Sequence, residues 1–161
     1  RLIVDLRENE GGILPIAIRM INEFLPEGKL ILYTQGKASP RMDYNSNGKG
    51  KYQQLPLTVL IDEASASASE IFAGAIQDYG LGSIVGTTTY GKGIVQQIFD
   101  LGDGTCVKLT MAEYYTPNGR NIHKKGITPD VEVEYQQDEN NPNADNQLDA
   151  ALEQVRNKIN Q

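Results

Sequence analysis

The sequence predicts an α/β fold in which a mostly parallel sheet carries an added β-hairpin. Short apolar runs typical of buried strands alternate with helix-like segments, and this alternation is characteristic of parallel sheets joined by right-handed crossovers. Two β-rich runs on either side of a Gly-Asp-Gly turn at 102–104 predict the hairpin. A chain of 161 residues with 39% hydrophobic residues has enough apolar surface for one core.

The N-terminal elements follow from apolar spacing. Three apolar runs predict strands, at residues 2–6, 29–34 and 57–62. A helix is expected over 13–25, where apolar residues recur every three or four positions, with Pro15 in its first turn. Between 36 and 54 the sequence is rich in Gly, Ser, Asn and Lys, which indicates an exposed hairpin or loop.

The next elements continue the alternation. A helix is expected over 67–79, with Gly80 past its end, followed by a strand at 83–87. The two runs of the hairpin cover 93–116, and a further strand is expected at 131–135.

The C-terminal part differs from the body in composition. Residues 136–146 form an acidic, Asn-rich stretch, which we interpret as a linker after a body that spans residues 1–135. A C-terminal amphipathic helix is expected at 147–161. Its apolar stripe, which includes Val155 and Ile159, predicts that it docks on the body or on a partner.

The composition argues against several classes of function. The formal charge of -6 argues against nucleic acids and anionic membranes, because both require clustered positive charge. One cysteine, Cys106, and one histidine, His123, are too few for an internal disulfide or a typical zinc site, so we expect no metal. The chain starts within a strand-like run, without an initiator methionine or a signal peptide. We therefore expect a piece of a longer protein.

Three alternating serines, Ser65, Ser67 and Ser69, lie where a predicted strand gives way to a helix. Ser67 with Glu70 three residues later matches a capping box, in which the serine hydroxyl only accepts a backbone amide. A nucleophile is the alternative reading. A helix start offers unpaired amides and a positive dipole end, so the amide of Ala68 can hold a developing oxyanion.

A nucleophilic serine needs a base, and the sequence offers His123, a carboxylate such as Glu70, or Lys92. Lys92 lies between two glycines and precedes an apolar run. Close packing there can exclude water, which disfavours the charged form of an amine. The alternative is an ordinary surface lysine in a glycine turn.

The same segment partly matches a phosphate-binding loop. "GTTTYGKG", residues 86–93, has the G-x-x-x-x-G-K spacing. Gly93 stands where Ser or Thr should bind magnesium, and a strand is expected where a helix should begin. We therefore reject nucleotide binding.

Four blocks resemble the C-terminal processing peptidases, also called tail-specific proteases. They are "DLRENEGG", "EASASASEIFAGAIQDYG", "VGTTTYGKGIVQ" and "DGTCVKLTMAEYYTPNGRNIHKKGITPD", and the resemblance extends to about Val133. It implies that Ser67 is the nucleophile, that Lys92 is the base, and that Gln96 orients the lysine. It also implies an oxyanion hole formed by the amide of Ala68 and that of Gly11 or Gly12.

The resemblance further implies a crotonase-like (ClpP/crotonase-type) core of repeated strand-strand-helix units. The implied activity is that of a serine endopeptidase which cleaves proteins near their C-termini through an acyl-enzyme and needs no cofactor. Its partner would be a peptide or protein with a free C-terminus, and the implied assembly and location are a homodimer outside the cytoplasm. The PDZ domain and N-terminal helices typical of the family have no counterpart in this sequence.

One geometric expectation concerns Lys92 and Gln96. Residues four apart on a straight strand lie about 13 Å apart, too far for these side chains to meet. We therefore expect a bend or turn near Gly93.

Two alternatives to this mechanism remain open. His123 in "GRNIHKKG" could serve as the base of a Ser-His-acid triad, although this polar loop favours an exposed histidine. The chain could also be a non-catalytic core that displays a peptide-binding groove.

Overall fold

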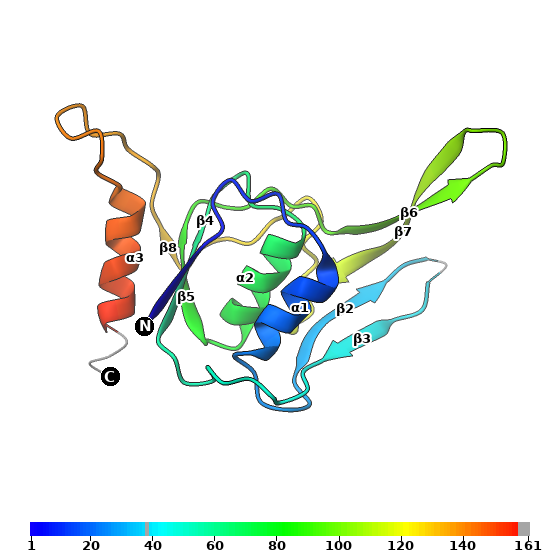
Figure 1. Cartoon of the computed structure of the whole chain (residues 1–161), viewed down its shortest axis with the longest axis horizontal. Helices are drawn as coiled ribbons and strands as arrows, with labels where there is room; N and C mark the ends of the chain where they lie inside the picture. The colour runs from blue at the N-terminus through cyan, green and yellow to red at the C-terminus, as the bar shows by residue number, and fades with distance from the viewer. Residues whose placement is uncertain (38, 158–161) are drawn as a thin grey trace.

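The described residues form two four-stranded sheets and three helices. A computed structural model describes residues 1–37 and 39–157 of the chain. Helices α1 and α2 lie between the two sheets, and α3 covers the outer face of the first sheet (Figure 1). A parallel sheet is thus confirmed, and it is joined by an antiparallel sheet larger than the predicted hairpin.

The parallel sheet has the strand order β1-β4-β5-β8. Its strands are β1 (Leu2–Asp5), β4 (Leu57–Ile61), β5 (Gly82–Gly86) and β8 (Val131–Glu132). All five residues of β4 are buried, because one face of this central strand packs in the core with α2 residues such as Phe72 and the other face packs on α3. β8 is shorter than the expected strand at 131–135.

The two inner helices start and end close to the predicted positions. α1 (Leu14–Asn22) has a proline in its first turn, and α2 (Ala68–Asp78) follows β4 after a short turn. α2 is buried along almost its whole length because it packs between the sheets (Figure 1). It therefore places its N-terminus at the carboxyl end of the parallel sheet.

The antiparallel sheet has the strand order β3-β2-β7-β6. Its strands are β2 (Leu30–Gln35), β3 (Met42–Asn45), β6 (Ile94–Asp100) and β7 (Cys106–Tyr115). The predicted strand at 29–34 thus pairs with β3 and β7 and lies outside the parallel sheet. The end of the β6–β7 hairpin projects away from the body (Figure 1).

One hydrophobic core is shared by both sheets and the inner helices. It includes Val59 from β4, Leu32 from β2, Tyr114 from β7, and Phe72 from α2. A smaller cluster, with Leu60, Val85 and Ala151 at its centre, joins the other face of the parallel sheet to α3.

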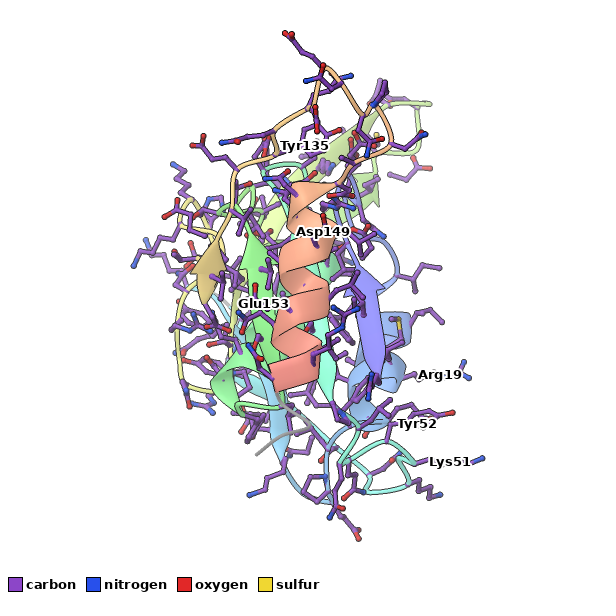
Figure 2. The ribbon with its side chains drawn as sticks, turned by 90° about the vertical axis from the view of Figure 1, so that its left-hand side faces the viewer. Arg19, Lys51, Tyr52, Tyr135, Asp149 and Glu153 are labelled. Carbon is purple, nitrogen blue, oxygen red and sulfur yellow. The ribbon has the colours of Figure 1, made fainter. Side chains whose placement is uncertain are left out.

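The predicted C-terminal helix corresponds to α3 (Asn146–Asn157) in the described residues. Its buried residues include Ala151 and Val155, so its apolar stripe docks on the body, whereas Ile159 lies outside the described residues. Asp149 and Glu153 lie on its outer side (Figure 2). In the described part of the chain, no helix is long and apolar enough to cross a membrane.

Candidate active site

Ser67 occupies a strained turn between β4 and α2. It is the N-cap of α2 and has φ 55° and ψ -113°. A positive φ costs a non-glycine residue about 1–3 kcal/mol, and such strain concentrates at functional sites. A serine on a strained strand-to-helix turn is also the arrangement that exposes the nucleophile in α/β-hydrolases.

The flanking serines have structural partners. The Ser65 hydroxyl donates to the carbonyl of Leu6 at 2.8 Å and is fully buried. The Ser69 hydroxyl donates to Asn9 Oδ1 at 3.1 Å. Both bonds join the start of α2 to the loop after β1. Ser67, which is half-buried, is therefore the serine of the block that remains a candidate for chemistry.

The glycine turn after β1 packs directly on the Ser67 turn. Gly11 has φ +94°, and a Cβ built on it would lie 2.5 Å from Ala66 O and 2.7 Å from Ala68 N. A side chain is thus excluded there by both backbone conformation and space. Asn9 fixes the contact from the other side, because its carbonyl accepts the Ala66 amide at 3.1 Å.

Two amides at this contact are candidates for binding an oxyanion. The Gly11 amide donates to Asn9 Oδ1 at 2.9 Å and is therefore already engaged. For the amides of Gly12 and Ala68, no acceptor is found among the described residues. The geometry thus favours Gly12 over Gly11 as the partner of Ala68.

Glu70 joins the Ser67 turn to the loop that carries Lys92. Its side chain is fully buried, and Oε2 accepts the amides of Ser67 and Lys92, each at 2.8 Å. Oε1 accepts the Thr89 hydroxyl at 2.6 Å and the Gly91 amide at 2.7 Å. The carboxylate returns to the N-cap amide as in a capping box, but it also holds a segment that lies 19 to 22 residues further along the chain.

The Lys92 side chain is exposed, which differs from the expectation of a shielded amine. Gly91 and Gly93 do permit close packing, but their neighbours are the backbone at Lys125 and at His123 rather than the amine. The side chain borders a cleft of about 1010 Å³ that also includes Ala66 and Tyr90. Within the described residues, no hydrogen bond joins the Lys92 amine to the Ser67 hydroxyl.

Gln96 lies on β6, beyond the bend expected near Gly93. Residues 87–93 form no strand, β6 begins at Ile94, and its register shifts between Val95 and Gln96. The Gln96 side chain is exposed, and its Nε2 lies 3.5 Å from Thr110 Oγ1. In the described structure it makes no hydrogen bond to Lys92.

His123 lies in the same cleft as Lys92 rather than in a fully exposed loop. It is half-buried, and its Nδ1 is buried without a hydrogen-bond partner among the described residues. The sequence identified His123 as an alternative base but favoured an exposed loop for it, and it did not indicate the structural roles of Asn9 and Thr89. The signal for Asn9 was its place two residues before Gly11, the first residue of the glycine pair.

No group of three or more His, Cys, Asp or Glu side chains in residues 1–37 and 39–157 is arranged to hold a metal ion. The site is therefore described by its serine, lysine, glutamate and backbone amides.

Comparison with known proteins finds a matching family model and several similar proteins. The family model described as Peptidase family S41 matches residues 1–133. A probable CtpA-like serine protease of Staphylococcus epidermidis is 39% identical over 133 residues, which cover 82% of this chain and 27% of the relative. A protein of the same name from Staphylococcus aureus is 37% identical over 135 residues, 83% of this chain and 27% of the relative.

A solved structure, the photosystem II D1 C-terminal processing protease, is similar with a TM-score of 0.78. It is 37% identical, and the match covers 83% of this chain and 34% of that chain. The chain therefore spans about a quarter to a third of the length of these relatives.

Proposed function

This chain belongs to Peptidase family S41, and we propose that it carries the catalytic centre of a serine endopeptidase that cleaves proteins near their C-termini. The observation that carries the proposal is the Glu70 carboxylate, which binds the amides of Ser67 and Lys92 at once. These two hydrogen bonds hold the strained turn of Ser67 and the loop of Lys92 at one side chain. The confirmed family resemblance supports the same pair of residues.

The proposed reaction begins with a neutral Lys92 amine. The amine takes the proton of the Ser67 hydroxyl as Oγ attacks the carbonyl carbon of the scissile bond. The amides of Ala68 and of Gly12 or Gly11 donate to the oxyanion, and the lysine then returns its proton to the leaving amine. A water molecule then attacks the carbonyl carbon of the acyl-enzyme in the same way. The bond to Ser67 Oγ breaks, and the carboxylic acid product is released.

The Lys92 side chain is open to solvent, and a lysine is an effective base only where its amine is shielded from water. We therefore infer that the substrate completes the site by lying in the cleft beside Lys92, Tyr90 and Ile94. Water leaves the cleft as the peptide enters it, and the neutral amine becomes favoured. The proposed role of Gln96, which is to orient this amine, rests on the resemblance alone.

Several wider features are part of the proposal. The fold is of the crotonase type, residues 1–135 carry the chemistry, and a linker joins them to the docked helix α3 (Asn146–Asn157). The substrate presents a free C-terminus and binds without a cofactor, and the whole protein works outside the cytoplasm as a homodimer. The family resemblance supports these features. This chain supplies the catalytic part.

The test compares turnover of an internally quenched peptide by the chain and its variants. Ser67→Ala and Lys92→Ala should abolish cleavage, and Lys92→Arg should do so as well, because a guanidinium keeps its proton. Lys108→Ala, at an exposed lysine on the projecting hairpin, is the matched control and should cleave normally. Undiminished cleavage by either Lys92 variant would refute the lysine as base.

A second candidate is a non-catalytic peptide-binding core. The exposed Lys92 and the absence of a described bond between it and Ser67 favour this reading. A fluorophosphonate probe separates the two, because labelling at Ser67 requires an activated hydroxyl. Loss of labelling in His123→Ala with retention in Lys92→Ala would instead support the Ser-His triad.

A further inference from the structure

Two polar side chains hold the loop between β1 and α1 against the turn that carries Ser67. The first is Asp62, whose two carboxylate oxygens accept the Glu8 amide at 2.9 and 3.1 Å. Glu8 has a positive φ of 57°, a conformation that is costly for a residue other than glycine. Asp62 Oδ1 also accepts the amides of Ala64 and Ser65. The start of the loop is therefore fixed on the β4–α2 turn.

The second side chain is that of Asn9, whose residue contacts the turn on both sides of Ser67. The carbonyl oxygen of Asn9 accepts the Ala66 amide at 3.1 Å. Its side-chain Oδ1 accepts the Ser69 hydroxyl at 3.1 Å and the Gly11 amide at 2.9 Å. A backbone amide can only donate, so the side-chain atom that faces Gly11 is the oxygen. Asn9 thus ties its own loop to the start of α2, although the residue is exposed.

The hydrogen bond between Gly11 and Asn9 bears on the next amide, that of Gly12. Two consecutive glycines leave the backbone many accessible conformations, so contacts outside the pair have to select one of them. Asn9 Oδ1 fixes the Gly11 amide, and Gly11 packs against Ala66 and Ala68 with φ +94°. The Gly12 amide is then held in a defined position. The space beside Gly12 is open, since a Cβ built there would meet nothing within 4 Å.

We propose that Asn9 is a positioning residue for catalysis, whose side chain holds the Gly12 amide where the oxyanion of the reaction forms. The inference rests on the proposed function, because it takes the oxyanion as the group that Gly12 binds. A donor that is fixed before the reaction stabilises the developing charge without a cost of reorganisation. Loss of the Asn9 side chain therefore weakens binding of the transition state and leaves binding of the substrate unchanged.

The first experiment compares kcat and KM for cleavage of an internally quenched peptide. Asn9→Leu keeps the size of the side chain but removes the acceptor, so kcat should fall about 100-fold, the cost of a misplaced oxyanion donor. KM should change by less than about 3-fold, since the lost interaction belongs to the transition state. Asn141→Leu makes the same change at an exposed asparagine before α3 and should leave both constants unchanged.

Asn9→Asp tests whether the acceptor is what matters. A carboxylate still accepts the Gly11 amide and the Ser69 hydroxyl, so the loop should keep its structure. Its negative charge lies near the developing oxyanion and opposes it, so kcat should recover only to about one tenth of the parent value. This variant should therefore cleave about 10-fold faster than Asn9→Leu.

Order parameters from nitrogen-15 relaxation test the position of the amides without any turnover. The Gly11 and Gly12 amides should be rigid in the parent and in Asn9→Asp, with S² of about 0.85, and S² should fall below about 0.6 in Asn9→Leu. An unchanged unfolding curve will show that each variant folds.

The two measurements separate this inference from the proposed function. If the parent does not cleave the peptide but Asn9→Leu loosens the Gly12 amide and Asn9→Asp does not, the positioning by Asn9 stands and the proposed reaction does not. Equal order of Gly12 in the parent and Asn9→Leu, loss of order in Asn9→Asp, or a kcat that Asn9→Leu leaves unchanged would overturn the proposal.

Discussion

Glu70 is buried, and each of its two carboxylate oxygens accepts two hydrogen bonds. Three of the four donors are backbone amides, which can only donate. Among side chains of this length, the carboxylate of glutamate is the one whose two terminal atoms both accept hydrogen bonds and donate none. The residue type at position 70 is therefore dictated by the four donors that converge on it.

Glu70→Gln should destabilise the chain and impair catalysis. Whichever way the amide is turned, its NH₂ group faces two donors, so two buried groups lose an acceptor. We expect the free energy of unfolding to fall by about 3 kcal/mol. Peptidase turnover should fall at least about 10-fold, because the amides of Ser67 and Lys92 lose their common partner. Denaturant unfolding and peptide cleavage measure the two effects.

Glu132→Gln is the matched control, because it makes the same change at an exposed glutamate on β8. It should leave stability within about 0.5 kcal/mol of the parent. Equal stability of the Glu70 and Glu132 variants would show that the four hydrogen bonds do not hold the site together.

At the scale of elements, α3 is joined to the loop after β1 by Arg7. The two terminal nitrogens of the guanidinium donate hydrogen bonds to the carboxylate of Asp145, at 2.8 and 3.0 Å, and one of them also donates to Gln147 Oε1 at 3.1 Å. The guanidinium also forms an ion pair with Asp5. Asp145 in addition caps α3, since its Oδ1 accepts the Leu148 amide at 2.9 Å. Docking of the helix therefore fixes a residue only four positions before Gly11.

The ion pair between Arg7 and Asp145 makes the docking of α3 sensitive to acid. The hydrogen bond from Arg7 holds the pKa of Asp145 below its usual value. Burial alone would raise the pKa of Asp5, but the hydrogen bonds and charge of Arg7 lower it overall. Carboxylates with depressed pKa stabilise the folded chain above about pH 3.9 and lose that contribution as pH falls through their folded-state pKa.

Asp145→Asn should weaken α3 docking by about 1 kcal/mol at neutral pH, because it removes the charge pair but keeps an N-cap acceptor. Asp145→Ala removes the cap too and should cost about 1 kcal/mol more. Amide hydrogen exchange along α3 measures the loss of docking stability in both variants. The difference in exchange between Asp145→Asn and the parent should shrink below about pH 4.

Glu153→Gln makes the same change of charge on the outer side of α3 (Figure 2) and serves as the control. Its exchange rates should match those of the parent. A difference between Asp145→Asn and the parent that persists unchanged at pH 3 would contradict the ion-pair account.

Individual elements were predictable where one local pattern dominates. α2 follows from its apolar spacing and its serine N-cap, and α1 from its apolar face and the proline in its first turn. Which strand a given strand pairs with depends less on its local sequence. The run at 29–34 is apolar enough for a parallel sheet, but it forms antiparallel pairs with β3, the next strand along the chain, and with β7.

The hairpin shows the same limit. Its turn and its two strands were predicted, yet Ile98 and Leu101 are 65% and 59% exposed because the hairpin extends beyond the body. Alternation of apolar residues indicates a strand, but it does not indicate how far along that strand the core continues.

At the scale of the whole molecule, the site exists because distant segments meet. The motifs identified Ser67 and Lys92, but not the burial of each, since burial depends on what the rest of the fold brings near. Glu70 and Thr89 connect the two segments through side chains whose patterns look ordinary in the sequence. Asn9 likewise has a defined role only once Ala66 and Ser69 lie beside it.

The shared core implies that the two sheets unfold together. Phe72 of α2 is 2% exposed and packs edge-on against Phe24 at 6.1 Å between ring centroids. Its helix contacts β5 of one sheet and β2 of the other. A cavity at this position therefore removes packing between α2 and both layers, and neither sheet retains a complete core of its own.

Phe72→Ala should lower the free energy of unfolding by about 3–5 kcal/mol, the cost of deleting a buried phenyl ring. Amide hydrogen exchange of β4 and of β2 reports each sheet separately, and the most protected amides of both should lose the same amount. Ile98→Ala, at an exposed side chain on the hairpin, should change neither strand by more than about 0.5 kcal/mol. If β4 lost protection while β2 kept it, the two sheets would be separate folding units. The contacts of Ser67 with the loop after β1 would then be independent of the antiparallel sheet that extends from Lys92.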